Sequence, residues 1–513
     1  MKKLFILSLL AGALTVSCNN DLLEPFTPGS LTSDLAITSS TDLQRVMNST
    51  YGLAANREDI VFSSVFTDEV GIGFSNGGQG ISDNYIFFLN ISSASPDIIW
   101  SNTYIILSRA NRVITFADDL IAKTASTNTA EIAKLKTLKA EALTVRAMAH
   151  LKIMAYFSPD LKSDAALAGV LVDRIIFSSD PVQQRVTNGV FYTAIHKDLD
   201  DALAIFATSL SPYTGSAAKL YASANLARGL KARAFGYKGD FANAEIWANN
   251  VISTSGLVLA NASNYANVFL TDAEPVNTEV IFRLKRTLQQ SAQGTNLGNG
   301  WASVTATFSG SPFFEISRAL YNKIDATPGD VRRSVIVAPT SVVDPNYATS
   351  ADYIKTDVLV LGKYPGSASV GNLNSDYKIM RLSEMYFLRA EGRVFANDLL
   401  GAAQAIKAIR DNRFATAQPL PVYANATAAW KAILDERRIE LAFEGHRFID
   451  LKRLGVLAGG SSIDRDPADY SSNSANYPAA NPINLPLSST KFALPIPISE
   501  LNANPSIQQN TGY

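Results

Sequence analysis

A long run without glycine or proline, residues 131–157, is the strongest constraint on what this chain can fold into. Its apolar residues recur at steps of three and four, the period of one helix face: Ile132, Leu135, Leu138, Ala142, Val145 and Ala149. Pro159 follows and restricts the backbone before it, so the helix should end there. A second stretch, from Phe191 to Leu203, repeats apolar residues every four positions. The pattern predicts long amphipathic helices.

Two further helices are predicted as a pair around Gly239-Asp240, over residues 223–237 and 241–252. Small alanines on both would let the helices approach closely, which is typical of tetratricopeptide repeats. Residues 381–414 echo this spacing around Asn397-Asp398. Such pairs stack because none buries its apolar face alone. With short strands expected at 278–284 and 332–338, the fold class is mainly α: irregular tetratricopeptide-like helical pairs with long loops and a few short strands.

The densest mixture of charged and apolar residues lies at 436–455, ERRIELAFEGHRFIDLKRLG. Thr427 is the expected N-cap of a helix that Gly445 would stop. Glu440 lies within helical spacing of neighbouring charges, so many of these charges are expected to pair locally. Glutamates beside His446 also suggest general acid–base chemistry. Ion pairs that hold a helix and its following turn onto the core are the preferred interpretation.

The same segment resembles the C-terminal signature of the SusD/RagB family, nutrient-binding outer-membrane lipoproteins of Bacteroidetes. Residues 376–392 (DYKIMRLSEMYFLRAEG) resemble a second family helix, with Gly392 in place of the usual alanine. The ending, PIPISELNANPSIQQNTGY, matches a third motif except at Thr511, where proline is usual. Residues 100–111 resemble a fourth. The resemblance covers the leader, the middle helices and the C-terminal third, and is thinnest at 270–375.

The first residues read as an export signal. Lys2 and Lys3 precede a short apolar run, and Cys18, the only cysteine of the chain, follows it. A single cysteine cannot form an internal disulfide. Residues 14–17 form a relaxed lipobox with Thr15 where leucine is commoner, so we expect lipidation at Cys18; the alternative is an incidental cysteine. Residues 18–34 read as a tether.

Two glycine-rich loops carry the candidate ligand residues. Residues 71–84 (GIGFSNGGQGISDN) lack the lysine and strand–helix frame of a phosphate-binding loop. Residues 289–314 place aromatic rings among small polar residues, a composition that suits stacking on a sugar ring. An equally open alternative is that the loop folds back and buries these rings. The candidate residues are Phe74, Asn76, Trp301, Phe313 and Phe314.

Charge and motifs exclude several other functions. The formal net charge is −1, and removing Lys2 and Lys3 makes it −3, which argues against nucleic-acid binding. The three histidines, His150, His196 and His446, are isolated, so no metal site is predicted. No nucleophile elbow occurs. We therefore expect no enzyme and no cofactor, although a glycosidase carboxylate pair stays open.

The resemblance implies a surface-exposed, lipid-anchored outer-membrane protein that captures an oligomeric nutrient and delivers it to a SusC-like TonB-dependent transporter. Glycan is the expected ligand, with peptide as an alternative. A surface glycoside hydrolase and a helical-repeat scaffold without a ligand stay open as well. The expected organisation is a signal peptide at 1–17, a tether at 18–34, a helical region at 35–270, a loop-rich, ligand-facing region at 271–375 and a C-terminal RagB/SusD region at 376–513.

Overall fold

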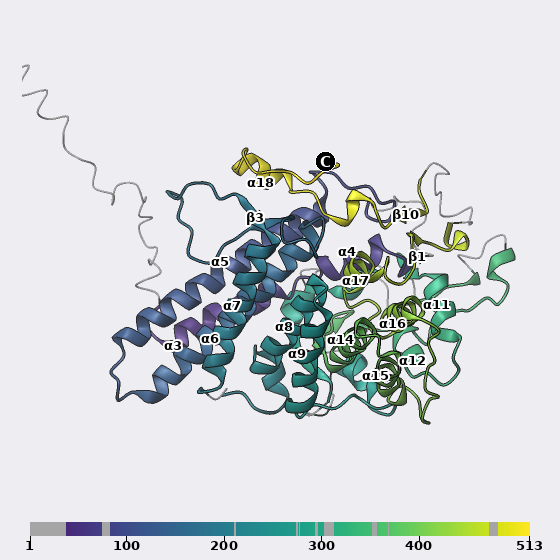
Figure 1. Cartoon of the computed structure of the whole chain (residues 1–513), viewed down its shortest axis with the longest axis horizontal. Coiled ribbons are helices and arrows are strands. Elements are labelled where there is room, and N and C mark those ends of the chain that lie inside the picture. Colours follow the sequence, from purple (N-terminus) through teal and green to yellow (C-terminus); the bar gives the residue numbers. More distant parts are fainter. Residues whose placement is uncertain are drawn as a thin grey trace, which may run out of the picture.

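The computed structural model describes residues 37–73, 83–209, 212–272, 275, 278–292, 296–301, 312–350, 356–367, 369–470 and 481–513. Within them the chain is mainly helical, as the periodicity predicts. Long helices occupy one end of the molecule, and a loop-rich part with short strands lies at the other (Figure 1). One continuous hydrophobic cluster runs from Leu43 to Ile507. In this part of the chain no helix is both long and apolar enough to span a membrane.

The N-terminal helices pack around α6 (Thr129–Phe157), the helix predicted from residues 131–157. Asn128 caps it, and Ser158 ends it just before Pro159. Its second half is buried on nearly every side because helices pack on it from several directions. The surrounding helices are α3 (Ser40–Ala54), α5 (Ala94–Lys123), α7 (Asn188–Phe206) and α8 (Ala224–Lys238), and α4 (Glu58–Phe66) leads from α3 to the loop-rich end.

The expected helix pairs are confirmed as α8 with α9 (Phe241–Thr254) and α14 (Leu382–Phe395) with α15 (Leu399–Asp411). Gly239 takes the left-handed conformation that ends α8, with φ of 80°. The pairs stack through α9 and α14. A Cβ at Gly392 would lie 2.9 Å from the carbonyl oxygen of Phe241, so this close approach accounts for glycine where the family usually has alanine.

In the part of the chain that the structure describes, the strands form five separate antiparallel pairs, consistent with a few strands on a helical protein. They are β1 (Val70–Ile72) with β5 (Phe314–Ile316), β2 (Leu167–Val170) with β3 (Arg185–Thr187), β4 (Val280–Leu284) with β8 (Tyr377–Arg381), β6 (Gly366–Ser367) with β7 (Gly371–Asn372), and β9 (Ser462–Asp464) with β10 (Asn484–Pro486).

The predicted strand at 332–338 is wrong. These residues begin as the short helix α12 (Arg332–Ile336), and Val337 alone forms an isolated bridge, to Leu361. The Arg332 backbone N–H donates to Asp330 Oδ1, which favours a helical turn over an extended strand. Alternation of apolar residues over so few positions does not distinguish the two.

The C-terminal part adds α10 (Leu288–Ala292), α11 (Arg318–Asp325), α16 (Ala426–Glu440), α17 (Arg447–Leu454) and α18 (Ile498–Ala503). Asn425 caps α16, two residues before the predicted Thr427, because its side chain accepts a hydrogen bond from the N–H of Ala428. The helix ends at Glu440, and a turn with Gly445 at φ of 84° leads into α17.

Candidate functional site

The described residues at the start of the first predicted ligand loop and at the end of the second are neighbours. Strand β1 pairs with β5 in the register Ile72 to Phe314. One residue further, the Gly73 N–H donates to the Phe313 carbonyl oxygen at 2.9 Å. A Cβ on Gly73 would lie 2.3 Å from the Pro312 carbonyl oxygen, so this position requires glycine. Gly73, which precedes segment 74–82, therefore lies beside Pro312 and Phe313, which follow segment 302–311.

Both ends of segment 302–311 are tied together at Trp301. The N–H groups of Phe313 and Phe314 each donate to the Trp301 carbonyl oxygen at 2.8 Å. The backbone on the two sides of the segment is thus fixed by hydrogen bonds and by the β1–β5 pair.

A third segment, 471–480, also begins next to the β1–β5 pair. It begins after the short 3-10 helix η8 (Pro467–Tyr470), which packs on β1. Asp469 Oδ1 accepts a hydrogen bond from the backbone N–H of Arg318, and a Cβ on Gly71 would lie 2.8 Å from this oxygen. Burial raises the pKa of Asp469 to about 7, and within the described residues its Oδ2 has no partner.

The predicted ligand residues have different surroundings. Phe74 and Asn76 lie outside the described residues. Trp301 is 2% exposed, its ring parallel to Tyr364 at 6.0 Å and edge-on to Phe443 at 5.4 Å. Phe314 is buried against Tyr85. For Trp301 and Phe314 the structure favours the alternative in which the loop buries its rings. Phe313 is half-buried at the base of segment 302–311.

Phe88, which the sequence patterns did not single out, has a side chain that is 48% exposed. It lies in the turn that follows segment 74–82, three residues after Tyr85, whose ring packs on Phe314. The sequence feature that could have identified Phe88 is a run of four large apolar residues, 85–88, directly after the glycine-rich loop. In such a run alternate rings can face the core, and here Tyr85 and Phe87 are buried while Phe88 is not.

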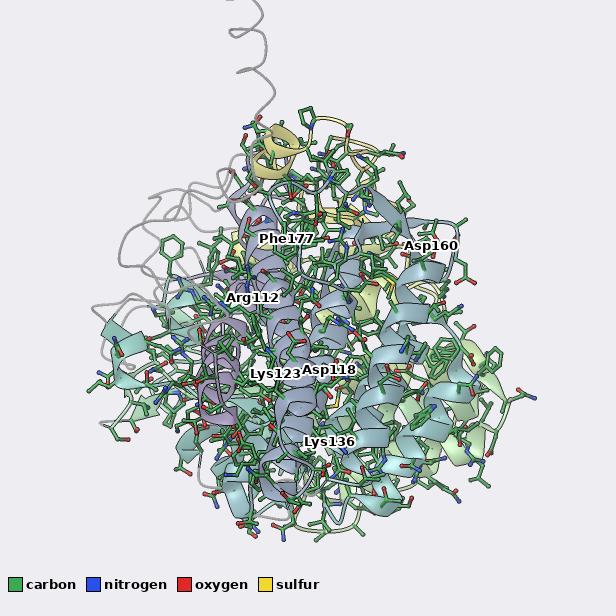
Figure 2. All side chains as sticks on the ribbon, turned by 90° about the vertical axis from the view of Figure 1, so that its left-hand side faces the viewer. Arg112, Asp118, Lys123, Lys136, Asp160 and Phe177 are labelled. Atoms are coloured by element: carbon green, nitrogen blue, oxygen red, sulfur yellow. The ribbon has the colours of Figure 1, made fainter. Side chains whose placement is uncertain are left out.

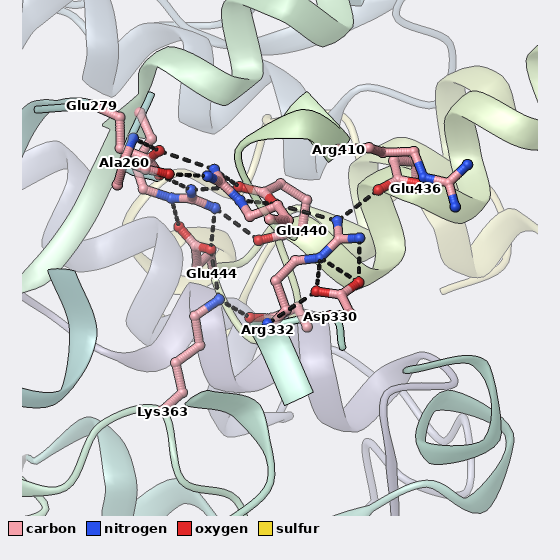
Figure 3. A network of polar contacts seen from close by, with 12 residues as sticks. Ala260, Glu279, Asp330, Arg332, Lys363, Arg410, Glu436, Glu440 and Glu444 are labelled. Atoms are coloured by element: carbon pink, nitrogen blue, oxygen red, sulfur yellow. Dashed lines mark hydrogen bonds and ion pairs between the residues drawn. The ribbon is translucent and has the colours of Figure 1, made fainter. Parts of the chain in front are cut away.

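The interior contains a buried set of charges that we call the arginine–glutamate cluster (Figure 3). Glu440 accepts hydrogen bonds from Arg381 at 2.8 Å and Arg413 at 2.7 Å, and lies 3.3 Å from Arg332. These arginines hold the pKa of Glu440 well below its usual range against the opposing effect of burial. The members are Glu279, Asp330, Arg332, Lys363, Arg381, Arg413, Glu436, Glu440 and Glu444.

The interpretation of residues 436–455 as ion pairs that hold a helix and its turn onto the core is thereby confirmed, but many of the partners lie on other elements and not within the segment. Partners of Glu440 come from β8, α12 and the turn after α15, between 27 and 108 residues away in sequence. In α17, Arg453 pairs both with Asp450, three residues away, and with Glu391 of α14. The short helix and its turn present charges in several directions, so each finds a partner on a different element.

The same segment fixes the position of β1. Arg447 of α17 donates two hydrogen bonds to Asp68, at 2.7 and 2.8 Å, two residues before the strand. Glu69 Oε1 accepts from the N–H of Phe443, and the Glu69 carbonyl oxygen accepts from the N–H of Ser317 after β5. The charged C-terminal segment therefore holds the base from which the loops extend.

The histidines are separate from one another, as predicted; His150 and His446 are buried, and His196 is partly buried. Burial lowers the pKa of His150 to about 3 and that of His446 to about 4, so both are neutral near pH 7. His196 stacks on Phe235 with ring centroids 4.2 Å apart. Among the described residues, no three histidine, cysteine, aspartate or glutamate side chains lie close enough together to hold a metal ion.

Comparison with known proteins gives the family. The SusD family model matches residues 286–513. SusD-like protein P25 of Formosa agariphila is 30% identical over 165 residues, an alignment that spans 29% of this chain and 29% of that relative. Residues 286–513 of this chain therefore belong to the SusD/RagB family. The matched range includes α16, α17 and every member of the cluster except Glu279.

Solved SusD-like structures share the fold over almost the whole chain. A SusD superfamily protein from Bacteroides thetaiotaomicron is 24% identical, with a TM-score of 0.74 over 92% of this chain and 99% of that one. A SusD-like carbohydrate binding protein from Bacteroides vulgatus is 16% identical, with a TM-score of 0.70 over 92% and 98%. A laminarin binding SusD-like protein is 20% identical, with a TM-score of 0.64 over 93% and 100%.

Proposed function

We propose that this protein is a lipid-anchored, surface-exposed outer-membrane binding protein that captures an oligomeric glycan and delivers it to a SusC-like TonB-dependent transporter. The observation that carries the proposal is that the described residues next to segments 74–82, 302–311 and 471–480 all lie at the β1–β5 pair. Phe74, Asn76 and Phe313 belong to the first two of these segments or their edges. The SusD-like relatives described as carbohydrate or laminarin binding support glycan as the ligand class.

Recognition without bond breaking fits the site. Asp469, one of the carboxyl groups at the β1–β5 pair, is buried and accepts a backbone hydrogen bond, which is a structural use. The glycoside hydrolase alternative needs two carboxyl groups flanking the ligand. Release of reducing ends from polysaccharides, abolished by one carboxylate substitution, would favour the hydrolase over our proposal.

Phe313→Ala is expected to weaken glycan binding about fivefold. A ring stacked on a sugar contributes on the order of 1 kcal/mol, by analogy with other aromatic contacts. Phe313 is half-buried, so its removal should leave the fold intact. A glycan array with the purified protein identifies the ligand, and calorimetric titration of the wild type and variant measures the affinity.

The matched control is Phe177→Ala. Phe177 is 55% exposed and lies at the end of the molecule formed by the long helices, away from β1 (Figure 2). Its removal should leave glycan affinity unchanged. Equal affinity in the wild type and Phe313→Ala would contradict the assignment of Phe313. Copurification with a large barrel protein without glycan affinity would favour the scaffold alternative, and peptide binding in place of glycan would correct the ligand class.

Cys18→Ala is expected to abolish incorporation of labelled palmitate and to release the protein from the membrane fraction. The thiol is the only one in the chain and directly follows the apolar run of the export signal, so no other cysteine can replace it. Labelling of cells that express either form, followed by fractionation, measures both effects. Equal labelling of the two forms would disprove lipidation at this residue.

A further inference from the structure

A cavity of about 300 Å³ lies between α3, α6 and residues 212–213, at the end of the molecule opposite β1 (Figure 1). Figure 2 looks onto this end, with Lys136 of α6 and Asp118 of α5 marked. Its volume is at the lower limit for small-molecule sites, which span about 300–1,000 Å³. It lies far from β1 and is not part of the site described above.

Glu141 of α6 forms part of the cavity wall although it is only 1% exposed. Its Oε2 accepts a hydrogen bond from the Tyr51 hydroxyl at 2.7 Å. Its Oε1 has no hydrogen-bond partner among the described residues. A buried polar atom without a hydrogen-bond partner destabilises the empty protein. A ligand that donates or accepts this hydrogen bond therefore gains binding free energy.

Burial raises the pKa of Glu141 to about 8, so the carboxyl group is neutral at pH 7. Because Oε2 accepts from Tyr51, the proton of the neutral acid belongs on Oε1. A neutral carboxyl group can donate to a ligand hydroxyl and also accept from one.

The remaining walls combine an aromatic ring with polar groups. Tyr213 lines the cavity, and its ring lies parallel to that of Tyr221 with centroids 3.4 Å apart. The Tyr213 hydroxyl donates to Gln44 Oε1 at 2.5 Å, which fixes the ring in place. Thr137 adds a hydroxyl group, while Lys134 of α6 contributes an exposed positive charge.

We propose that this cavity is a second binding site, which takes a single neutral sugar ring or similar polyol against Tyr213 and Glu141. A sugar presents hydroxyl groups to Glu141 and Thr137 and apolar C–H groups to the aromatic ring. Lys134, with Arg45 on α3, disfavours a cationic ligand, the other class that a carboxyl group attracts. The proposal does not depend on glycan binding at the loops.

Saturation-transfer NMR with the methyl glycosides of glucose, galactose and mannose tests the proposal, with choline as the cationic comparison. At least one glycoside is expected to bind, and Tyr213→Ala and Glu141→Leu should each weaken that binding about tenfold, as the loss of one good contact would. Glu141→Gln, which is uncharged and keeps a donor and an acceptor, should bind within about threefold of the wild type. Circular dichroism confirms that each variant is folded.

Phe313→Ala separates this site from the loops, because it should leave the signal that Tyr213→Ala removes. Three results would overturn the proposal: no saturation transfer to any of the three glycosides, equal transfer in the wild type and in folded Tyr213→Ala, or stronger binding of choline than of any sugar. Loss of the signal in Phe313→Ala together with its retention in Tyr213→Ala would assign the sugar to the loops alone.

Discussion

Glu440→Gln is expected to lower the free energy of unfolding by about 3–5 kcal/mol, because it removes one negative charge from a buried network and leaves its partners in place. Glu440 is fully buried and contacts Arg332, Arg381 and Arg413. The glutamine amide keeps the shape but cannot neutralise these guanidinium groups, which are themselves buried. Chemical denaturation of the two proteins, followed by circular dichroism, measures the difference.

The matched control is Lys431→Gln, on the same helix. Lys431 is exposed and pairs with Asp435 four residues away, so its removal should cost less than about 0.5 kcal/mol. A loss below about 1 kcal/mol for Glu440→Gln would mean that the cluster contributes no more than surface pairs do. Both residues are charged and lie on α16, so the difference between the two losses in free energy of unfolding measures the effect of burial.

Local patterns predicted the helices because periodicity directly reports the buried face. The run without glycine or proline at 131–157 became α6, and Gly239 and Asn397 ended the first helices of the two pairs. The same reasoning failed at 332–338, where the local sequence does not contain the decisive interactions. Arg332 there pairs with Asp330, Glu436 and Glu440, and two of these partners lie more than a hundred residues away.

Charge pairing shows the same limit of local information. The concentration of charges at 436–455 predicted ion pairs, and their spacing suggested partners one helical turn away. The helix ends at Glu440, however, and the turn that follows points Glu444 toward Lys363 and Arg381. A spacing rule identifies a partner only while the helix continues.

For the candidate site, composition identified two loops but not their relation. The sequences of residues 71–84 and 289–314 do not indicate that β1 pairs with β5. These two strands lie more than two hundred residues apart in the chain. Composition also could not divide the aromatic rings into buried and surface ones. Trp301 is in the core because Tyr364 and Phe443 reach it from other segments, whereas Phe313, twelve residues on, is half-buried.

The stability of the protein is expected to fall steeply as the pH drops below about 4. Arginine partners lower the pKa of Glu384 to about 2 and hold the pKa of Glu440 far below the usual range of a glutamate. A lowered pKa stabilises the fold above the unfolded-state value, and this contribution is lost as the pH falls through the folded-state value. Burial has the opposite effect on Glu69 and Asp469, because it raises the pKa of each to about 7. Their contribution to the stability of the fold is lost as the pH rises from about 4 to 7.

Two variants separate these opposing contributions in denaturation curves recorded from pH 2 to pH 8. Glu384→Gln removes a carboxylate paired with Arg233 at 2.6 Å, so it should be less stable than the wild type at pH 7 and converge with it as the pH approaches 2. Asp469→Asn keeps an oxygen for the Arg318 N–H but cannot ionise, so its stability relative to the wild type should rise between pH 5 and pH 8. A constant difference between Glu384→Gln and the wild type across the whole range would contradict this account, because the carboxylate would then stabilise the fold by its shape and not by its charge.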